Sequence, residues 1–289
     1  MNAADTIETP KQRTLTRLRR SRSAQTGAIV ILGCLLMAVF CQMLAPYSPD
    51  ARDATVDAPS GPSARHWLGV DANEKDVLSR VMYGSRLSLF AGLVSITFAV
   101  AVGAPAGAVA GLFGGWAETI IMRSIDIALA FPSILIALLV ATAYKPGWSA
   151  VIIAVGLINV PVFARQVRVT VLTLRYLDYV TASRALGASP LHILGRVIVP
   201  GIVNPVVVLA TMGLGAAILE VAGLSFLGVG GDPTEPEWGS MLAQAKDHLS
   251  SSVWPAVGPG VAISLAILGF NLLGDGLRDA LDPRLGESE

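Results

Sequence analysis

The side chains that most often perform chemistry are few in this sequence and stand far apart. His66, His192 and His248 fall in three separate polar stretches. Cys34 and Cys41 lie seven residues apart in one apolar run, a spacing that indicates packing on one helix face. No HExxH, CxxC, GxSxG or GxxxxGKS/T motif occurs. The sequence therefore predicts no metal site, no catalytic centre and no nucleotide-binding site in this chain.

Three polar side chains, Asn159, Glu220 and Asn271, interrupt long apolar runs. A charge at membrane depth costs about 2.5–3.5 kcal/mol on insertion scales, so such groups are expected to face protein or water. All three are candidates for the lining or gate of a path across the membrane. A second interpretation stays open for Glu220, as the buried partner of a donor on this or a neighbouring subunit.

The composition places the chain in a lipid bilayer. Of its 289 residues 53% are hydrophobic and only 15% are charged, whereas a soluble protein of this length carries more charge. Its net charge of zero argues against nucleic acid as a partner. The sequence predicts an all-α integral membrane protein with six transmembrane helices, from apolar runs at 27–44, 87–113, 119–143, 148–164, 202–229 and 254–273.

Basic residues are distributed unequally between the two sides of these spans. If the N-terminus is cytoplasmic, 14 of the 21 lysines and arginines are cytoplasmic: Lys11, Arg13, Arg17, Arg19, Arg20, Arg22, Arg123, Arg165, Arg168, Arg175, Arg184, Arg196, Arg278 and Arg284. The outer side keeps Arg52, Arg65, Lys75, Arg80, Arg86, Lys145 and Lys246. Because cytoplasmic connections carry the excess of such residues, both termini are predicted to be cytoplasmic.

This orientation divides the chain into five parts: a basic cytoplasmic segment at 1–26, a first transmembrane helix at 27–45, an extracytoplasmic loop at 46–86, a five-helix membrane domain at 87–280 and a cytoplasmic tail at 281–289. In the outer loop, residues 65–80 are expected to form a short helix on the outer face. Arg123 and Asp126, three apart on one helix face, are expected to form an ion pair.

Gly103, Gly107 and Gly111 recur at every fourth residue of the second span. Such a row of small residues lets another helix approach closely, and Pro105 within it predicts a kink. Two interpretations stay open, a glycine-rich helix of the general kind and a specific contact with another subunit. Both place this face against protein.

A polar segment, YVTASRALGASPLHILGRVIVP, runs from Tyr179 to Pro200 on the predicted cytoplasmic side. Residues 182–186 favour helix, Gly187 permits a turn, and Ser189-Pro190 form an N-cap and N1 pair for a second short helix at an angle to the first. A rigid pair of helices there would transmit the motion of a cytoplasmic protein to the fifth span. The alternative is an amphipathic loop whose arginines contact anionic lipid.

This segment, with the pattern YVxAxRALGASPxxIxxRxIxP, resembles the coupling loop of ABC importer permeases. Further stretches resemble the second ("C-type") permease subunit of the dipeptide and oligopeptide importers: HWLGVDANEKDVLSRVMYGSRLSL at 66–89, GGWAETIIMRSIDIALAFPSILIAL at 114–138, ILEVAGLSFLGVG at 218–230, EWGSML at 237–242 and LGFNLLGDGLRDALDPRL at 268–285. The resemblance covers essentially 27–285. The chain departs from the family's pattern at Thr181, where glutamate is usual, at Gly201, where asparagine is usual, and at Glu74-Lys75, where Gly-Arg is common.

The resemblance implies a type I ABC importer permease-like fold and a location in the bacterial cytoplasmic membrane. It implies a homologous second permease subunit, two cytoplasmic ABC ATPase domains that hold ATP and Mg²⁺, and an extracytoplasmic substrate-binding protein; this chain itself would bind no cofactor. The coupling loop would lie within 165–200 and contact the ATPase through Tyr179, Thr181, Ala182, Arg184, Ala185, Leu186, Gly187, Ala188, Pro190, Arg196 and Pro200.

We interpret the chain as the permease subunit of an ATP-driven importer of dipeptides or oligopeptides, and not as an enzyme. A nickel or nickel-chelate importer shares most of these motifs, and the sequence does not separate the two. A different class stays open as well, a transporter driven by an ion gradient in which Glu220 binds the ion. Uptake that survives ATP depletion would favour that class.

Overall fold

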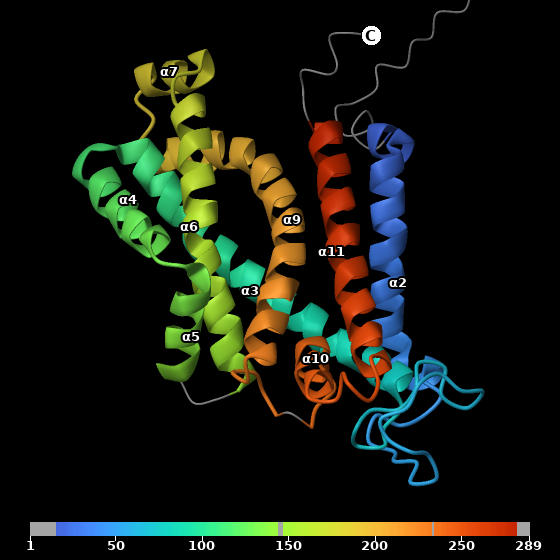
Figure 1. Ribbon diagram of the computed structural model, residues 1–289. Helices are drawn as coiled ribbons and strands as arrows, with labels where there is room; N and C mark the ends of the chain where they lie inside the picture. Colours follow the sequence, from blue (N-terminus) through green and yellow to red (C-terminus); the bar gives the residue numbers. More distant parts are fainter. Residues whose placement is uncertain (1–15, 144–146, 233, 282–289) are drawn as a thin grey trace, which may run out of the picture.

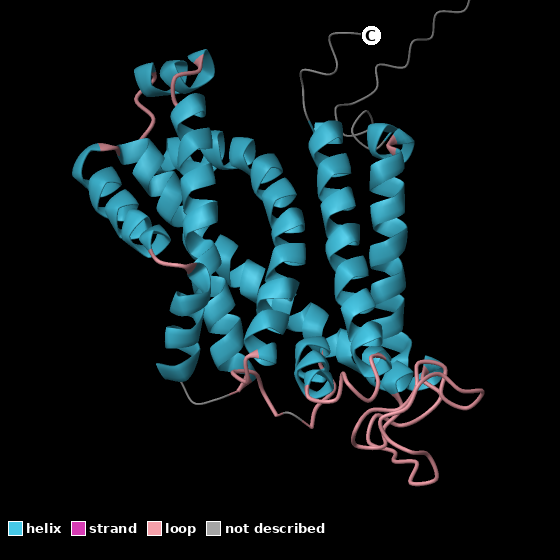
Figure 2. Cartoon of the chain, viewed as in Figure 1, coloured by secondary structure: helices cyan, strands magenta, loops and turns pink. Residues whose placement is uncertain are grey.

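The computed structural model describes residues 16–143, 147–232 and 234–281, and in this part of the chain the regular elements are helices (Figure 2). Five helical stretches are long and apolar enough to cross a membrane: α2 (Arg22–Leu44), α3 (Val77–Phe113), α6 (Trp148–Leu174), the stretch Pro190–Phe226 and α11 (Trp254–Leu281). The predicted all-α class is confirmed for the described residues.

The third predicted span, 119–143, is two helices and not one. α4 (Gly115–Ala130) and α5 (Ser133–Ala143) meet at 96°. The break falls at Phe131, which is extended, because a residue that precedes a proline is driven out of the helical region and Pro132 has no N–H for a helical bond. When this bent pair is counted as one span, the number of spans reaches the predicted six.

Several helices extend beyond the apolar runs that predicted them. α3 begins at Val77 and not at Leu87, with the Asp76 side chain accepting a hydrogen bond from the Ser79 N–H. The short outer helix predicted for 65–80 is therefore wrong, because its last four residues are the first turn of α3. The residues before them form turns and isolated bridges, such as Ser60 with Val70. A hydropathy pattern cannot locate the first residue of such a helix, because polar residues continue a helix wherever its backbone hydrogen bonds stay satisfied.

The bundle has two distinct ends (Figure 1). At the end that we name the α7 end lie α7 (Asp178–Ala185), the start of α2 and the end of α11. At the opposite end, the α10 end, lie α10 (Trp238–Lys246) and the loop 45–76. Lys11, Arg13, Lys145 and Arg284, which entered the orientation argument, and the tail 282–289 lie outside the described residues.

α3 packs closely across α6 through the glycine row. A Cβ atom added at Gly103 would lie 2.6 Å from the Val160 carbonyl oxygen, and one at Gly107 would overlap the Ala164 carbonyl oxygen. One at Gly111 would lie 2.8 Å from the Val171 Cβ. The protein that covers this face is thus α6 of the same chain. α3 continues through Pro105 without a break.

Three apolar clusters hold the helices together. One joins α3, α5, α6 and α9 (Val199–Phe226) around Phe163 and Leu224. A second joins α3, α9, α10 and α11 around the fully buried Trp238. The third, at the α7 end, fixes the polar segment that the sequence singled out.

Candidate functional site

The segment Tyr179–Pro200 has the predicted first half. α7 forms the first helix, and Gly187 then reverses the chain with a φ of 80°, in the left-handed region that glycine adopts without a steric cost. Ser189 caps the next helix by accepting a hydrogen bond from the His192 N–H, and Pro190 occupies its first turn. The predicted turn and N-cap are confirmed.

The second half differs from the prediction of a separate short helix. α8 (Pro190–His192) runs into a π-helix at Ile193–Ile198, and this runs directly into α9. The Val199 N–H donates to the Leu194 carbonyl, which lies five residues back, as in a π-helix. The next residue, Pro200, has no N–H, and its ring would collide with a carbonyl in a regular α-turn. The segment after Gly187 is therefore the beginning of a continuous helical stretch, Pro190–Phe226, that crosses the bundle.

One face of this segment is anchored and the other is free. Val180, Ile193 and Ile198 are buried against Val167 and Val171 of α6. The opposite face extends outward, with Leu186 89% and Leu191 73% exposed. Of the residues predicted to contact an ATPase, Ala188 is half-buried, and the exposed ones are Tyr179, Thr181, Ala182, Arg184, Ala185, Leu186, Gly187, Pro190, Arg196 and Pro200. We name the exposed face around Leu186 and Leu191 the corner of this segment. Because the buried residues hold the segment in place, these two exposed leucines form a surface to which another protein can bind.

Two ion pairs fix α4 to α6 on the same side of the bundle. Glu118 accepts from Arg168, and Asp126 accepts from Arg165 at 2.8 Å. The predicted pair of Arg123 with Asp126 is therefore wrong. A carboxylate three residues from an arginine on an exposed helix gains little from that neighbour, whereas an arginine of an adjacent span offers a fixed partner. Sequence spacing alone could not reveal a pair between two spans.

In mid-span, Asn159 of α6 and Glu220 of α9 meet. The Asn159 side-chain N–H donates to the Glu220 carboxylate at 2.6 Å and also to the Val155 carbonyl at 2.9 Å. Among the hydrogen bonds of the described residues, none joins Asn271 to this pair. The structure thus favours the interpretation of Glu220 as the partner of a donor, and that donor lies in the same chain.

Replacing Asn159 with leucine should destabilise the protein more than replacing both partners. Asn159→Leu leaves the Glu220 carboxylate half-buried without its donor, a loss of about 1–3 kcal/mol, whereas Asn159→Leu with Glu220→Leu removes both polar groups at little cost. Thermal unfolding of the detergent-solubilised variants measures this. A double variant that melts below Asn159→Leu would contradict the pairing.

A cavity of about 390 Å³ opens between α6, α9 and α11 toward the α7 end. Its lining includes the polar side chains Gln166, Asn204 and Arg278, beside the apolar Met212. None of the three mid-span candidates lines it. Sequence reasoning missed this cavity because its polar residues come from three separate helices that are distant in the chain.

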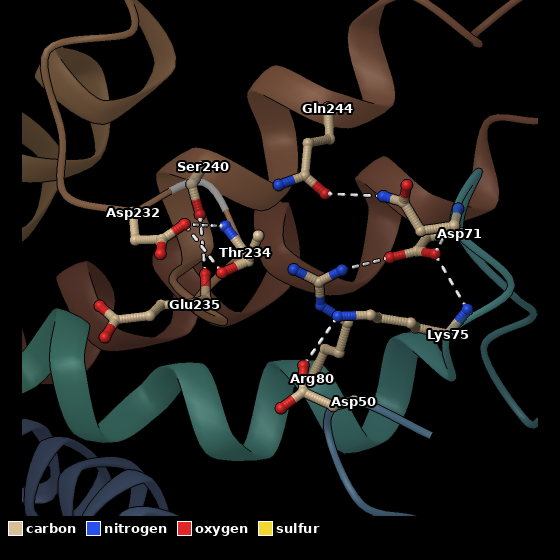
Figure 3. A network of polar contacts seen from close by, with 10 residues as sticks. Asp50, Asp71, Lys75, Arg80, Asp232, Thr234, Glu235, Ser240 and Gln244 are labelled. Carbon is tan, nitrogen blue, oxygen red and sulfur yellow. Dashed lines mark hydrogen bonds and ion pairs between the residues drawn. The ribbon is translucent and has the colours of Figure 1, made fainter. Parts of the chain in front are cut away.

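The α10 end is a dense polar layer that links the loop 45–76 to α3 (Figure 3). Arg80 of α3 is 1% exposed and pairs with Asp71, whose carboxylate also accepts from the backbone N–H groups of Asn73 and Lys75. The Lys75 ammonium in turn pairs with Asp50 at 2.7 Å. These bonds therefore hold the loop in a fixed position at the start of α3.

α10 joins the same layer through a buried carboxylate. Glu237 accepts hydrogen bonds from the N–H groups of Gly239 and Ser240, and from the hydroxyl of Ser88 on α3. The Trp238 indole N–H donates to the Val81 carbonyl at 3.0 Å. Burial raises the pKa of Glu237, against the lowering effect of these donors. Both contacts fix α10 to α3.

His66 lies between two carboxylates in this layer. Its Nδ1 is 2.8 Å from Asp76 and its Nε2 is 3.3 Å from Asp53, and the Tyr47 ring packs against the imidazole. Burial lowers the pKa of His66, but the hydrogen bonds to Asp76 and Asp53 outweigh it and raise this pKa above 6.5. Bonds from Thr55 and His66 lower the pKa of Asp53 to about 2.

This arrangement predicts a loop that loosens as the pH rises. The pKa of His66 is higher in the folded protein than in the unfolded chain. The contribution of protonated His66 to the stability of the folded loop is therefore complete below the unfolded pKa of about 6.5 and is lost as the pH rises through the folded pKa. Cleavage of the loop 46–76 by an added protease should therefore accelerate only as the pH rises above about 6.5 and through the folded pKa of His66, after correction for the protease's own pH profile. His66→Gln should flatten this dependence and His248→Gln should not. An unchanged profile in His66→Gln would refute the assignment.

The sequence matches known membrane transport components over nearly its whole length. Residues 103–287 match the model of the family "Binding-protein-dependent transport system inner membrane component". Residues 9–62 match "N-terminal TM domain of oligopeptide transport permease C".

Curated relatives share this coverage. A dipeptide transport system permease protein of Alkalihalophilus pseudofirmus is 40% identical over 280 residues, which are 97% of this chain and 92% of that protein. A glutathione transport system permease protein of Pectobacterium atrosepticum is 41% identical over 279 residues, 96% of this chain and 93% of that protein.

A solved structure titled as an inward-facing conformation of the MetNI methionine ABC transporter has a chain with the same fold. The TM-score is 0.59 at 19% identity, and the match covers 70% of this chain and 97% of that one.

Proposed function

The chain belongs to the family of binding-protein-dependent transport system inner membrane components, and from this premise we propose that it forms half of the membrane path of an ATP-driven importer of dipeptides or short oligopeptides. It is a multi-pass protein of the inner membrane and a permease subunit of the ABC importer class. The peptide substrate is proposed from relatives whose names specify dipeptide and glutathione.

The observation that carries the proposal is the exposed corner of the segment Tyr179–Pro200. Its free face offers Leu186 and Leu191, while Val180, Ile193 and Ile198 hold it to α6 and the start of α9. A force on this corner reaches two membrane helices without an intervening flexible loop. We assign it as the contact with a partner ATPase that holds ATP and Mg²⁺, and the α7 end as cytoplasmic.

The proposed cycle follows from these connections. An extracytoplasmic binding protein delivers peptide to the α10 end, and the ATPases close around ATP and displace the corner formed by Leu186. α9 is continuous with this corner, and α6 packs on it, so both helices tilt together. Because Asn159 and Glu220 link the same two helices at mid-depth, the pair keeps α6 and α9 in register while the path changes its open side.

The test is reconstitution of the chain with whatever copurifies from its native membrane. We expect an ATPase, a second permease and a binding protein, and uptake of a labelled dipeptide into liposomes that requires ATP. Glutathione and nickel ions are assayed beside the dipeptide, and uptake of nickel alone would replace the peptide assignment. Uptake that continues without ATP and stops when the ion gradient is collapsed would refute the ATP-driven function.

A further inference from the structure

A groove of about 520 Å³ lies between α2 and α3, away from the segment Tyr179–Pro200. Leu35 and Val39 of α2 form one wall, and Phe90 and Leu93 of α3 form the other. All four side chains are about half exposed or more, from 47% for Leu35 to 62% for Val39. The volume is in the range of about 300–1,000 Å³ that holds small ligands.

Among the described residues that line this groove, Arg86 is the only charged one. It is exposed, and no ion pair or hydrogen bond to it occurs in the described part of the chain. Arg86 follows the start of α3 by nine residues, about 13.5 Å along the axis, and Val39 precedes the end of α2 by five, about 7.5 Å. Arg86 directly precedes the apolar run 87–113, so it lies near the headgroup level at the α10 end.

The floor of the groove extends from Arg86 toward the middle of the bilayer. Leu214 of α9 and Phe270 of α11 form the floor of the groove between the two walls. An arginine without a protein partner beside apolar walls favours an anion, and its planar guanidinium matches a phosphate through two parallel hydrogen bonds. A free phosphate would leave the apolar walls unused, and a neutral acyl chain would leave the cation unpaired.

We propose that this groove is a binding site for one anionic phospholipid, with its acyl chain between α2 and α3 and its phosphate on Arg86. The site concerns neither substrate nor ATPase, so it stands whether or not the importer carries peptides. It assigns α2 a role as the outer wall of a lipid site, and the exposed apolar face of α2, including Ile29 and Leu32, meets the surrounding bilayer.

The test uses the complete complex, purified from its native membrane and exchanged into nanodiscs of phosphatidylcholine with or without phosphatidylglycerol. Native mass spectrometry counts the lipids retained after mild activation. We expect one phosphatidylglycerol held preferentially per copy of this chain, with retention at least fivefold lower in Arg86→Gln. Arg123→Gln is the matched control, because it removes another exposed arginine, on α4 and outside this groove, and it should retain the lipid.

A photo-crosslinking residue in place of Leu35 identifies what occupies the groove in the assembled complex. An adduct with phospholipid, lost in Arg86→Gln, supports the proposal. An adduct with the second permease subunit would overturn it, since a protein helix would then fill the space. Equal retention of phosphatidylcholine and phosphatidylglycerol by the unaltered chain would overturn the proposal as well, even if the Arg86→Gln and Arg123→Gln variants assemble normally.

Discussion

Gly187→Val should reduce ATP-dependent uptake by about tenfold or more while the complex still assembles and hydrolyses ATP. The backbone at Gly187 has a φ of 80°, where a β-branched residue is a steric outlier that costs about 1–3 kcal/mol. A Cβ atom at this position would meet no neighbour within 4 Å, so the cost is conformational and not one of crowding. We expect the chain to relieve this strain by opening the turn, which would displace Leu186 relative to the start of α9. Uptake per ATP hydrolysed in liposomes measures the loss.

Two further variants separate this cause from general damage to the segment. Gly195→Val adds the same side chain eight residues later, also with no atom within 4 Å, but in helical backbone, and should keep most of the uptake. Gly187→Asn should retain more uptake than Gly187→Val, because asparagine tolerates the left-handed region. If Gly187→Val transported normally, the turn would have no part in coupling.

The sequence predicted this turn well because its signals are local. Gly187 follows a run that favours helix, and Ser189-Pro190 is typical of the N-cap and first residue of another one, so both features could be located without tertiary information. The spans at α2 and α11 were predictable for a similar reason, since a long apolar run has few other structures available in a bilayer.

The features that the sequence mispredicted or did not reveal depend on contacts between segments distant in the chain. The partner of Asp126 is Arg165, 39 residues away, and the donor for Glu220 is Asn159, 61 residues away. The layer around Arg80 and Asp71 depends on a loop without regular structure. No periodicity reports such pairs, because they arise only after the helices have packed.

Gly107→Ala should destabilise the protein strongly, although alanine is the better helix former. In an unpacked helix this change gains about 0.5–1 kcal/mol. At Gly107 the new methyl group would overlap the Ala164 carbonyl oxygen of α6, a backbone atom that no side-chain rotation can move. α3 and α6 must then separate along the row that also holds Gly103 and Gly111, and overpacking of this kind costs about 1–3 kcal/mol. The thermal midpoint in detergent should fall clearly.

Gly33→Ala provides the opposite sign from the same chemical change. Gly33 lies exposed on α2, and a Cβ atom there would have no neighbour within 4 Å. The thermal midpoint of Gly33→Ala should stay the same or rise slightly, because alanine has the higher helix propensity and no contact opposes it. If both variants lost stability equally, the effect would belong to glycine as such and not to the contact of α3 with α6. A fall confined to Gly107→Ala would instead identify helix-to-helix backbone approach as what holds the two spans together, since lipid supplies no hydrophobic force to replace it.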